Sequence, residues 1–464
     1  MDLTNAPEKY AGLAGWEKLI SESQERCVIV VRPENVNSVL DLCKHEEVEA
    51  TIVGKFDDSG IYHVLDQNQS IVFLPMEYLH KGAPQRVIEA HWKKPVHKEP
   101  EISVDDDLTN DMLNFIGQPN LQSYSWIFER YDHEVQGGSV LKPIVGLGRG
   151  KSDAIAYHAV LGQPEVVIET WGSNPLQGDI DTYHMGRNNI VDAIGKVVAA
   201  GGSLDRIYFN GNAMCPPPQK DTLDAAKTLR MVKGVGDAEL MFDAPTISGK
   251  DSPSMQREYI STKDNKTRVV KGQHEMLMSA LAIIPDSSTI TSPDFKLPGD
   301  YIFVVGKTNN ELGASEWYRR HSAIGNTVPC SNLQEIRQQY ANLEKAIHAG
   351  FVHSAQYVAK GGLAAALTNS SLAGDLGYEI DIGAIDEEIG RPEVLLTSET
   401  TGRFVVSVSP NNTESFKKLM GRTYVRKIGN VRNNKYITIN YNERTIVQTD
   451  VPELRSYNKG GIYL

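Results

Sequence analysis

The chain has 464 residues, more than one hydrophobic core usually serves, so we expect roughly two to four domains. Its 40% hydrophobic and 23% charged residues are typical of a globular protein, and a net charge of −12 argues against a nucleic-acid partner. The sequence has no apolar run of membrane-spanning length, no signal-peptide pattern and only four scattered cysteines, which together predict a reduced, cytoplasmic protein without membrane contact.

The first predicted unit is a strand, a helix and a β-hairpin. Residues 27–31 (CVIVV) form a β-branched run typical of a buried strand. Residues 34–43 (ENVNSVLDLC) carry apolar residues at helical spacing, with an asparagine near the start as a cap. The turn sequence DDSG at 57–60 then predicts a hairpin.

A polar, proline-containing stretch, HWKKPVHKEPEISVDDD at 91–107, follows and predicts a linker. A helical segment is expected over 108–130 and a mixed region of strands and helices over about 131–290. A last α/β region begins at about 298 and contains the strand FVVSV, the helix NNTESFKKLM and the hairpin turn RNN.

The two ends of the chain repeat each other. LISESQERCVIVVRP (19–33) and LTSETTGRFVVSVSP (396–410) share a Ser-Glu pair, an arginine four residues after the glutamate, an apolar strand and a proline. Farther on, IVGKFDDSGIYHV (52–64) matches IGNVRNNKYITI (428–439), and the offset changes only from 377 to 375. Such persistence indicates a duplicated folding unit, of which the first copy begins abruptly at its strand.

Four segments resemble phosphoribosylformylglycinamidine synthase of the AIR-synthase-like superfamily: SESQER (21–26), GQPNLQSYSWIFERYDHEVQGGSV (117–140), GKTNNELGASEWYRR (306–320) and SETTGRFVVSV (398–408). They occur in the family's order over nearly the whole chain. The resemblance implies an α+β fold in which a PurM-like N-terminal (barrel-forming) domain is followed by a PurM-like C-terminal α/β sandwich. A partial copy of that sandwich precedes both.

In that family the complete enzyme is a tandem duplication with lobes N1, C1, N2 and C2. The resemblance implies that residues 1–90 are the second half of C1, 91–115 a linker, 116–295 N2 and 296–464 C2. The family's catalytic histidine lies in N1, so no catalytic residue is assigned and the isolated chain is expected to be inactive. Without N1, the N2 barrel face would be an apolar patch, which predicts self-association into a homo-oligomer.

The resemblance implies substrate contacts at Glu22, Ser23 and Gln24, which match the family's Glu-Ser-Gln tripeptide. A polar loop before a strand can offer a carboxylate and an amide to the ribose and glycinamide of formylglycinamide ribonucleotide. The alternative is a capping turn, because Ser-Glu recurs at 398–399 where no substrate is expected.

The turn TISGKDSPSM (246–255) resembles the family's Ser-Gly-Lys-Asp-Ser. Gly249 would let the backbone approach a nucleotide phosphate, Asp251 would hold Mg²⁺ and Ser252 would bond the substrate phosphate. An ordinary strand-ending turn is the alternative. FNGNAMCPPPQ (209–219) retains Asn212 as a nucleotide-binding candidate, although Phe209 replaces the family's aspartate.

The glycine-rich segment GLGRGKSDAIAYHAV (146–160) is not a P-loop, because Val145 stands where the motif needs glycine. By resemblance, Asp153 is a carboxylate for a metal-bound nucleotide, or else a turn cap. On the segment 179–202, Asp192 and Lys196 occupy the family's metal-side Glu and Asn positions, one helical turn apart. Asp192 is, with Asp251, one of the two metal candidates.

The largest departure from the family is HSAQYVAKGGLAAAL (353–367), where Gln356, Tyr357 and Lys360 replace a histidine and two aspartates. Hard cations need oxygen ligands, so the auxiliary Mg²⁺–nucleotide site is expected to be lost. We hypothesise that Lys196 and Lys360 point into this old pocket and neutralise its aspartates without metal or nucleotide. The alternative is that both lysines face solvent.

The leading interpretation is therefore part of an ATP- and Mg²⁺-dependent C–N ligase of purine biosynthesis that acts on formylglycinamide ribonucleotide. An N1-containing synthetase part and a separate glutaminase subunit are the expected partners, since the chain shows no glutaminase nucleophile. The alternative is a non-catalytic structural or interaction module with a degenerate nucleotide site. A selenophosphate synthetase is disfavoured, because the Glu-Ser-Gln and Tyr-Asp-His-x-Val-Gln segments belong to the purine enzyme.

Overall fold

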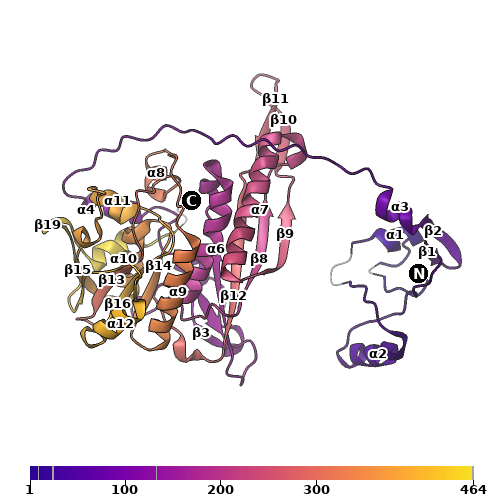
Figure 1. Ribbon diagram of the computed structural model, residues 1–464, viewed down its shortest axis with the longest axis horizontal. Helices are drawn as coiled ribbons and strands as arrows, with labels where there is room; N and C mark the ends of the chain where they lie inside the picture. Colours follow the sequence, from indigo (N-terminus) through magenta and orange to yellow (C-terminus); the bar gives the residue numbers. More distant parts are fainter. Residues whose placement is uncertain (9, 23–25, 132, 462–464) are drawn as a thin grey trace. The chain divides into compact units, whose positions relative to one another are not determined.

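The computed structural model describes residues 1–8, 10–22, 26–131 and 133–461, and divides into two compact units, Met1–Val87 and Ile88–Leu464 (Figure 1). Each unit contains both helices and strands, which confirms the mixed α+β class. Over the described ranges, no helix is both long enough and apolar enough to cross a membrane.

The first unit is small, and its described residues contain a single hairpin. Its elements are α1 (Gly15–Ile20), α2 (Val36–His45), β1 (Ile61–Asp66), β2 (Gln69–Pro75) and α3 (Met76–Lys81). The antiparallel pair β1–β2 is closed by Gln67 and Asn68, which both have left-handed φ angles, as a two-residue hairpin turn requires. The prediction of a turn at DDSG is wrong, because those residues precede β1.

The predicted strand CVIVV is also wrong. Residues 27–31 form no strand, and Val28, Ile29 and Val30 are 74%, 64% and 72% exposed. A strand needs a neighbouring strand to bond its backbone groups, and the described part of this unit offers none beside these residues.

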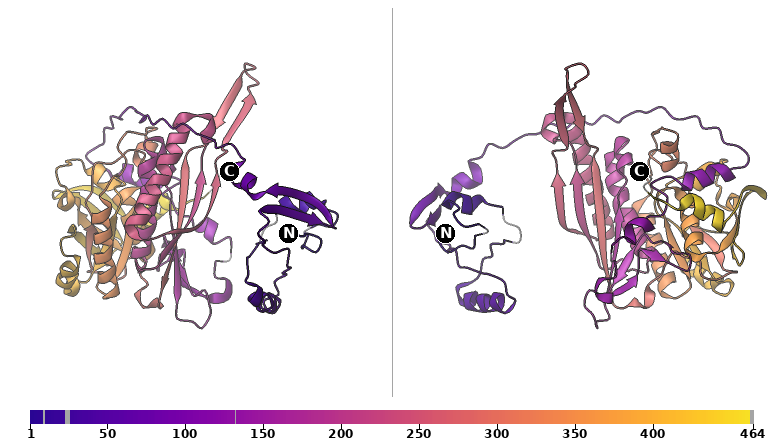
Figure 2. Two further views of the ribbon diagram at one scale, coloured as in Figure 1. Left: turned by 45° about the vertical axis from the view of Figure 1, so that its right-hand side comes forward. Right: turned by 180° about the vertical axis from the view of Figure 1, so that it is seen from behind.

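The second unit begins with a six-stranded sheet in the order β3-β6-β7-β12-β8-β9. The strands are β3 (Ser139–Leu141), β6 (Ile155–Tyr157), β7 (Val166–Gly172), β8 (Ile207–Met214), β9 (Thr246–Ser252) and β12 (Glu275–Ile284). Helix α6 (Thr182–Ala199) packs against β7, β12 and α7 (Thr222–Phe242). Asp181 and Asp221 cap these helices by accepting from backbone N–H groups. The hairpin β10 (Gln256–Ile260)–β11 (Thr267–Lys271) projects beyond the sheet (Figure 2).

A seven-stranded sheet follows in the order β14-β16-β13-β17-β15-β18-β19. Its strands are β13 (Tyr301–Val305), β14 (Ser354–Val358), β15 (Gly377–Asp381), β16 (Arg403–Val408), β17 (Val425–Arg432), β18 (Tyr436–Tyr441) and β19 (Arg444–Asp450). The predicted RNN hairpin is wrong, because β17 and β18 lie on opposite sides of β15. The hairpin is β18–β19, closed by Asn442 and Glu443 in left-handed conformations.

Helices cover both faces of this second sheet. The helices of the region are α8 (Glu316–Arg320), α9 (Leu333–His348), α10 (Gly362–Gly374), α11 (Pro392–Thr397), α12 (Thr413–Met420) and α13 (Val451–Asn458). Alternate residues of each strand enter different cores, so that Phe303 packs with α9 and α12 whereas Val304 packs with α10 and α11. Shorter elements complete the unit: α4 (Thr109–Ile116), α5 (Ser125–Phe128), β4 (Ile144–Val145) and β5 (Gly150–Lys151).

The structure confirms the repeat between the two ends of the chain. The helix starts Gly15 and Pro392, and likewise Val36 and Thr413, are 377 positions apart. The hairpin starts Ile61 and Tyr436 are 375 positions apart. Both hairpins carry an irregularity at the same step of the first strand, between Val64 and Leu65 in one copy and between Ile439 and Asn440 in the other.

The copies differ where the second copy depends on additional strands. β16, the counterpart of residues 26–31, is bonded on its two sides by β13 and β14 and is buried throughout. No described segment of the first unit corresponds to those two partners. The hairpin survives in the first copy because each of its strands supplies the other's hydrogen bonds.

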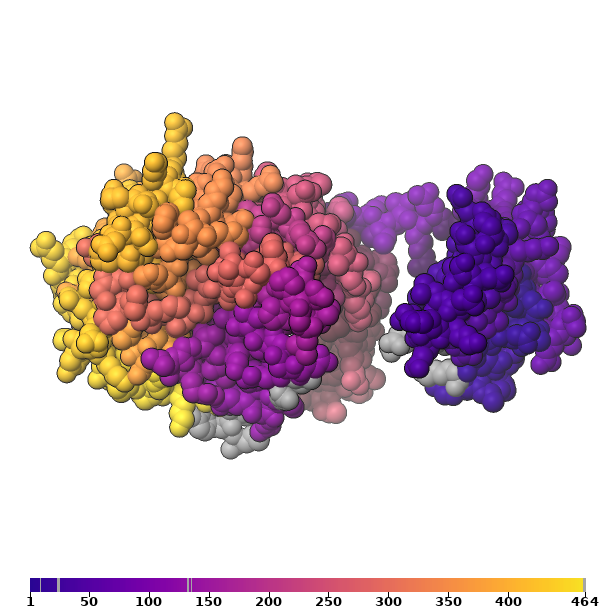
Figure 3. All heavy atoms as spheres, turned by 90° about the horizontal axis from the view of Figure 1, so that it is seen from below, coloured from indigo at the N-terminus to yellow at the C-terminus, as the bar shows by residue number. Residues whose placement is uncertain are grey.

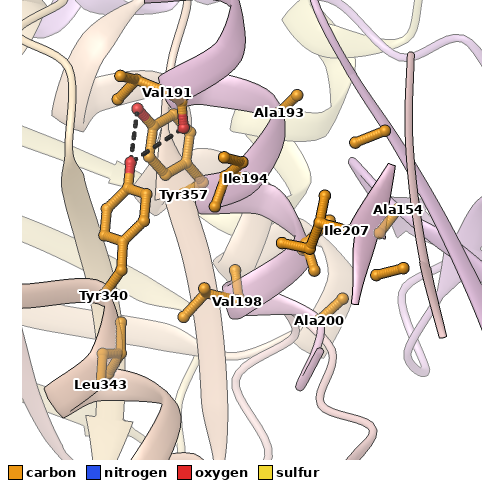
Figure 4. Close-up of a cluster of buried hydrophobic side chains, with 14 of the residues drawn as sticks. Ala154, Val191, Ala193, Ile194, Val198, Ala200, Ile207, Tyr340, Leu343 and Tyr357 are labelled. Atoms are coloured by element: carbon orange, nitrogen blue, oxygen red, sulfur yellow. Dashed lines mark hydrogen bonds between the residues drawn. The ribbon is translucent and has the colours of Figure 1, made fainter. Parts of the chain in front are cut away.

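One hydrophobic core joins the two sheets of the second unit. Val191, Ile194 and Val198 of α6 face Tyr340 and Leu343 of α9 (Figure 4). The Tyr340 hydroxyl donates to the backbone oxygen of Val191 at 3.1 Å and lies 3.4 Å from the Tyr357 hydroxyl. Atoms of the two sheet regions, magenta and orange to yellow, abut over a continuous surface (Figure 3). The two regions therefore hold each other in a fixed arrangement.

Candidate functional site

A cavity of about 170 Å³ lies where the two sheet regions of the second unit meet. It is lined from the first region by Asp153, Trp171, Asp192 and Lys196, and from the second by β14 and the turn that follows it. The cavity therefore gathers residues that are about 200 positions apart in the sequence, among them Asp153 and Gln356.

Helix α6 brings Asp192 and Lys196 to the cavity, because residues four apart lie on one helical face. The Asp192 carboxylate accepts hydrogen bonds from the Tyr357 hydroxyl at 2.7 Å and from the Asn174 amide at 2.8 Å. Burial raises the pKa of Asp192, while nearby Lys196 and these hydrogen bonds act in the opposite direction. The Asp192 carboxylate therefore accepts hydrogen bonds from two neutral side chains, those of Tyr357 and Asn174.

Lys196 is buried against the ring of Trp171. Its ammonium donates to the backbone oxygen of Trp171 at 2.8 Å and lies 3.7 Å from the centroid of the Trp171 ring. Burial lowers the pKa of Lys196. The ammonium of Lys360 lies 5.9 Å from the same ring. Both lysines line the cavity, so the expectation that they face into it agrees with their placement.

Asp153 is held from the opposite side. Gln356, which is 3% exposed, donates its amide to Asp153 at 2.7 Å and to the backbone oxygen of Tyr357 at 3.0 Å. The side-chain oxygen of Gln356 is buried and has no hydrogen-bond partner in the structure. The glutamine therefore occupies one oxygen of Asp153 and leaves an acceptor of its own unsatisfied.

Lys151 is a third cavity lysine, and sequence reasoning missed it. Its ammonium donates to the backbone oxygen of Leu121 at 3.3 Å and lies 5.2 Å from the centroid of the Tyr124 ring. Burial lowers the pKa of Lys151; the charge of Asp153 raises this pKa, and the charges of Lys196 and Lys360 lower it. The available signal was its position in Gly150-Lys151-Ser152, two residues before Asp153.

These donors do not fit Mg²⁺. The ion prefers six oxygen ligands in near-octahedral geometry, and the cavity offers two carboxylates that already accept hydrogen bonds, beside three ammonium groups. Within the described ranges no cluster of three or more His, Cys, Asp or Glu residues is arranged to hold a metal ion. No step of a reaction is therefore assigned to a metal in this cavity.

The other candidates fall into two places. Asn212 on β8 lies opposite Lys250 on β9. Gly249, Asp251 and Ser252 are close neighbours of Lys250 on the same strand. β9 is the outermost strand of its sheet, Gly249 and Asp251 are exposed, and none of these residues lines the cavity. The Lys250 ammonium donates to the Ser252 hydroxyl.

The predicted substrate tripeptide belongs to the other unit. Glu22 is exposed there, whereas Ser23 and Gln24 lie outside the described residues. The structure thus brings together Asn212, Gly249, Asp251 and Ser252 at one sheet edge, and Asp153, Asp192, Lys196, Gln356 and Lys360 at the cavity.

Comparisons with known proteins agree with this fold. The model of the family described as AIR synthase related protein, C-terminal domain, matches residues 1–66 and 298–442, so one family description covers part of each copy of the repeat. Phosphoribosylformylglycinamidine synthase subunit PurL of Thermococcus sibiricus is 30% identical over 458 residues, 97% of this chain and 60% of the relative. The corresponding subunit of Methanococcus aeolicus is 25% identical over 98% of this chain and 60% of its own length.

Among solved structures, Thermotoga maritima PurL complexed with FGAR has a TM-score of 0.57 at 14% identity, covering 74% of this chain and 52% of that one. The same protein complexed with ATP has a TM-score of 0.53 at 14% identity, covering 74% and 51%. These likenesses show the fold. The chain spans about 60% of the length of the two curated relatives. The chain is therefore similar in sequence to the PurL subunits of phosphoribosylformylglycinamidine synthase along nearly its whole length, and residues 1–66 and 298–442 match the AIR synthase related C-terminal domain family.

Proposed function

We propose that this chain is one part of an ATP-dependent phosphoribosylformylglycinamidine synthase and contributes substrate-side and nucleotide-side residues to a shared active site. The observation that carries the proposal is the exposed outer strand β9, which presents Gly249, Asp251 and Ser252 beside Asn212. The sequence likeness to PurL along 97% of the chain supports it.

The active site is completed by polypeptide that supplies the N1 lobe and the rest of C1. β9 is bonded to a neighbour on one side only, and Ile247 on it is 67% exposed. In the first unit, Val28, Ile29 and Val30 expose apolar side chains that their counterparts in β16 bury. Apolar strand residues left open in this way are typical of surfaces that another chain covers.

In the proposed reaction ATP activates the amide oxygen of formylglycinamide ribonucleotide as an iminophosphate, and ammonia displaces the phosphate. Asp251 would hold Mg²⁺ with the nucleotide, since a carboxylate beside a phosphate site suits this ion. Gly249 would admit the nucleotide phosphate to the backbone, and Ser252 would bond the substrate phosphate. Ammonia would come from a separate glutaminase subunit.

The experiment is an assay of amidine formation with formylglycinamide ribonucleotide, ATP, Mg²⁺ and ammonia. We expect no turnover by the chain alone and turnover when an N1-containing synthetase part is added. In the mixture, Ser252→Ala and Asp251→Asn should lower kcat/KM by ten-fold or more, while Ser254→Ala, outside the proposed contacts, should not. A chain that forms no complex with the N1-containing part and restores no activity would overturn the proposal.

The second candidate is a non-catalytic structural or interaction module. The unsuitable donor set of the cavity favours it, because a lysine and an amide stand where metal ligands are expected. In that case the chain would still bind the N1-containing part, but Ser252→Ala and Asp251→Asn would leave the activity of the complex unchanged.

A further inference from the structure

We propose that the cavity between the two sheets binds a small phosphate-type oxyanion, orthophosphate or pyrophosphate, directly through lysines and without a divalent metal. The inference concerns a site separate from β9 and does not depend on the proposed ligase activity.

The charge of the cavity is the first argument. Three lysines (Lys151, Lys196 and Lys360) and two aspartates (Asp153 and Asp192) line it, an excess of one positive charge when all are ionised. Among the described residues, Lys196 and Lys151 donate to backbone oxygens and not to either aspartate, although both aspartates act electrostatically on Lys196. The aspartates instead accept from Gln356, Tyr357 and Asn174, all of which are neutral.

The hydrogen-bonding capacity of the lysines is the second argument. An ammonium group has three donors. Lys196 uses one on the backbone oxygen of Trp171 and Lys151 uses one on that of Leu121. Lys360 makes no hydrogen bond to any residue that the structure describes. Several N–H donors from three separate chain segments are therefore available to one ligand.

Electrostatic strain gives the third argument. Burial lowers the pKa of Lys151 and Lys196, and the charge of Lys360 lowers both further, although nearby aspartates act in the opposite direction. An oxyanion at the centre would attract all three at once in surroundings of low dielectric constant, where charge-assisted hydrogen bonds are strong. Without a ligand, three ammonium groups share the cavity with two carboxylates, and a bound anion would add further negative charge.

The volume restricts the ligand. About 170 Å³ is below the roughly 300–1,000 Å³ of ordinary small-molecule sites, which favours one or two phosphate groups over a whole nucleotide. The two aspartates would repel an anion, but each is fixed by hydrogen bonds to its own neutral donors. In this proposal the lysine donors bind the oxyanion, and Mg²⁺ has no role.

Calorimetric titration of the full chain with orthophosphate and with pyrophosphate, in buffer containing EDTA, tests the proposal. We expect saturable binding of at least one of them, unchanged or weakened when Mg²⁺ replaces EDTA, and weaker binding of ADP under the same conditions. Lys360→Met should weaken binding at least ten-fold, as should Lys151→Met. Lys418→Met, on the exposed face of α12, is the matched control and should bind like the parent chain.

Thermal unfolding separates a lost site from a damaged fold. Lys196→Met removes a buried charge but also the hydrogen bond to the Trp171 backbone oxygen, so each protein is compared with its own ligand-free form: phosphate or pyrophosphate should raise the Tm of the parent and not that of the variant. Absence of saturable binding by the parent, binding only when Mg²⁺ is present, or equal binding by Lys360→Met and Lys418→Met would each overturn the proposal. The result of the amidine-formation assay does not bear on this proposal, because phosphate binding in the cavity does not depend on ligase activity.

Discussion

The hydroxyl of Tyr357 donates a 2.7 Å hydrogen bond to the carboxylate of Asp192, and this bond connects β14 of one sheet region to α6 of the other. The same hydroxyl accepts from the backbone N–H of Gly402 at 2.9 Å. A tyrosine here gives a buried carboxylate a neutral hydrogen-bond donor, and the same side chain links the two sheet regions.

Tyr357→Phe should therefore destabilise the chain, because it leaves both the Asp192 carboxylate and the Gly402 N–H without this partner. The expected loss is about 1–3 kcal/mol of unfolding free energy, measured by urea denaturation. Tyr436→Phe, at a tyrosine that is 65% exposed, is the control and should change stability little. Equal effects of the two variants would contradict this account of the bond.

Glu399 predicts a dependence of stability on pH. Burial raises its pKa from 4.5 to about 7, although the Oε1 atom accepts from the backbone N–H groups of Glu316 and Gly361. The charge of Glu316 raises this pKa further and that of Lys360 lowers it. Between pH 4.5 and 7 the folded state holds a proton that the unfolded state has released, so stability falls as pH rises through this window.

The variant Glu399→Gln should remove that contribution. Urea unfolding at pH 5 and at pH 7.5 should show that the parent chain loses on the order of 1–3 kcal/mol relative to the variant over this interval. Glu414→Gln, on the surface of α12, should follow the parent curve. A parent chain that becomes more stable relative to Glu399→Gln as pH rises would reverse the sign and refute the assignment.

The two copies of the repeat predict unequal losses of stability for equivalent substitutions. Val406 in β16 is fully buried, whereas its counterpart Ile29, 377 positions earlier, is 64% exposed. Val406→Ala should cost on the order of 2 kcal/mol of unfolding free energy, and Ile29→Ala in the isolated chain less than about 0.5 kcal/mol. Both are measured by chemical denaturation. If an added synthetase part covers residues 28–30, Ile29→Ala should weaken that complex.

The turn of the second hairpin offers a stabilising substitution. Glu443 has a φ of 67°, a region that glycine enters without the steric cost that a Cβ atom brings. Glu443→Gly should stabilise the chain by roughly 0.5–1 kcal/mol, provided that the bond from its backbone N–H to Asp381 persists. Glu443→Ala keeps the Cβ and serves as the control. A glycine variant no more stable than the alanine variant in thermal unfolding would contradict the strain argument.

Local sequence patterns predicted those elements that are held together by contacts between residues close in the sequence. The spacing of Asp192 and Lys196 placed both on one face of a helix, and α6 presents both to the cavity. The repeat was visible because each copy keeps the same helices and hairpin. Residues 27–31 were predicted as a strand because their β-branched composition is typical of one, but a strand also needs partners, which composition does not reveal.

Other features were hidden because their signals were weak. The hairpin turns Gln67–Asn68 and Asn442–Glu443 contain no glycine, so the glycine-containing DDSG attracted the prediction instead. Lys151 was considered only as part of a failed P-loop motif. Its place in the cavity depends on how the two sheet regions pack, and no short stretch of sequence contains that information.

The change of offset between the copies lies at the end of one helix. α2 has ten residues and α12 has eight, so the two extra residues of the first copy extend its C-terminal turn. Within a helix, an insertion of two residues would rotate every later side chain by about 200° and turn the apolar face outward. At the C-terminal end of the helix, the two extra residues change only the length of the last turn and the loop that follows. After the ancestral gene was doubled, its two descendants could therefore diverge in length there while both hairpins kept the same irregular step.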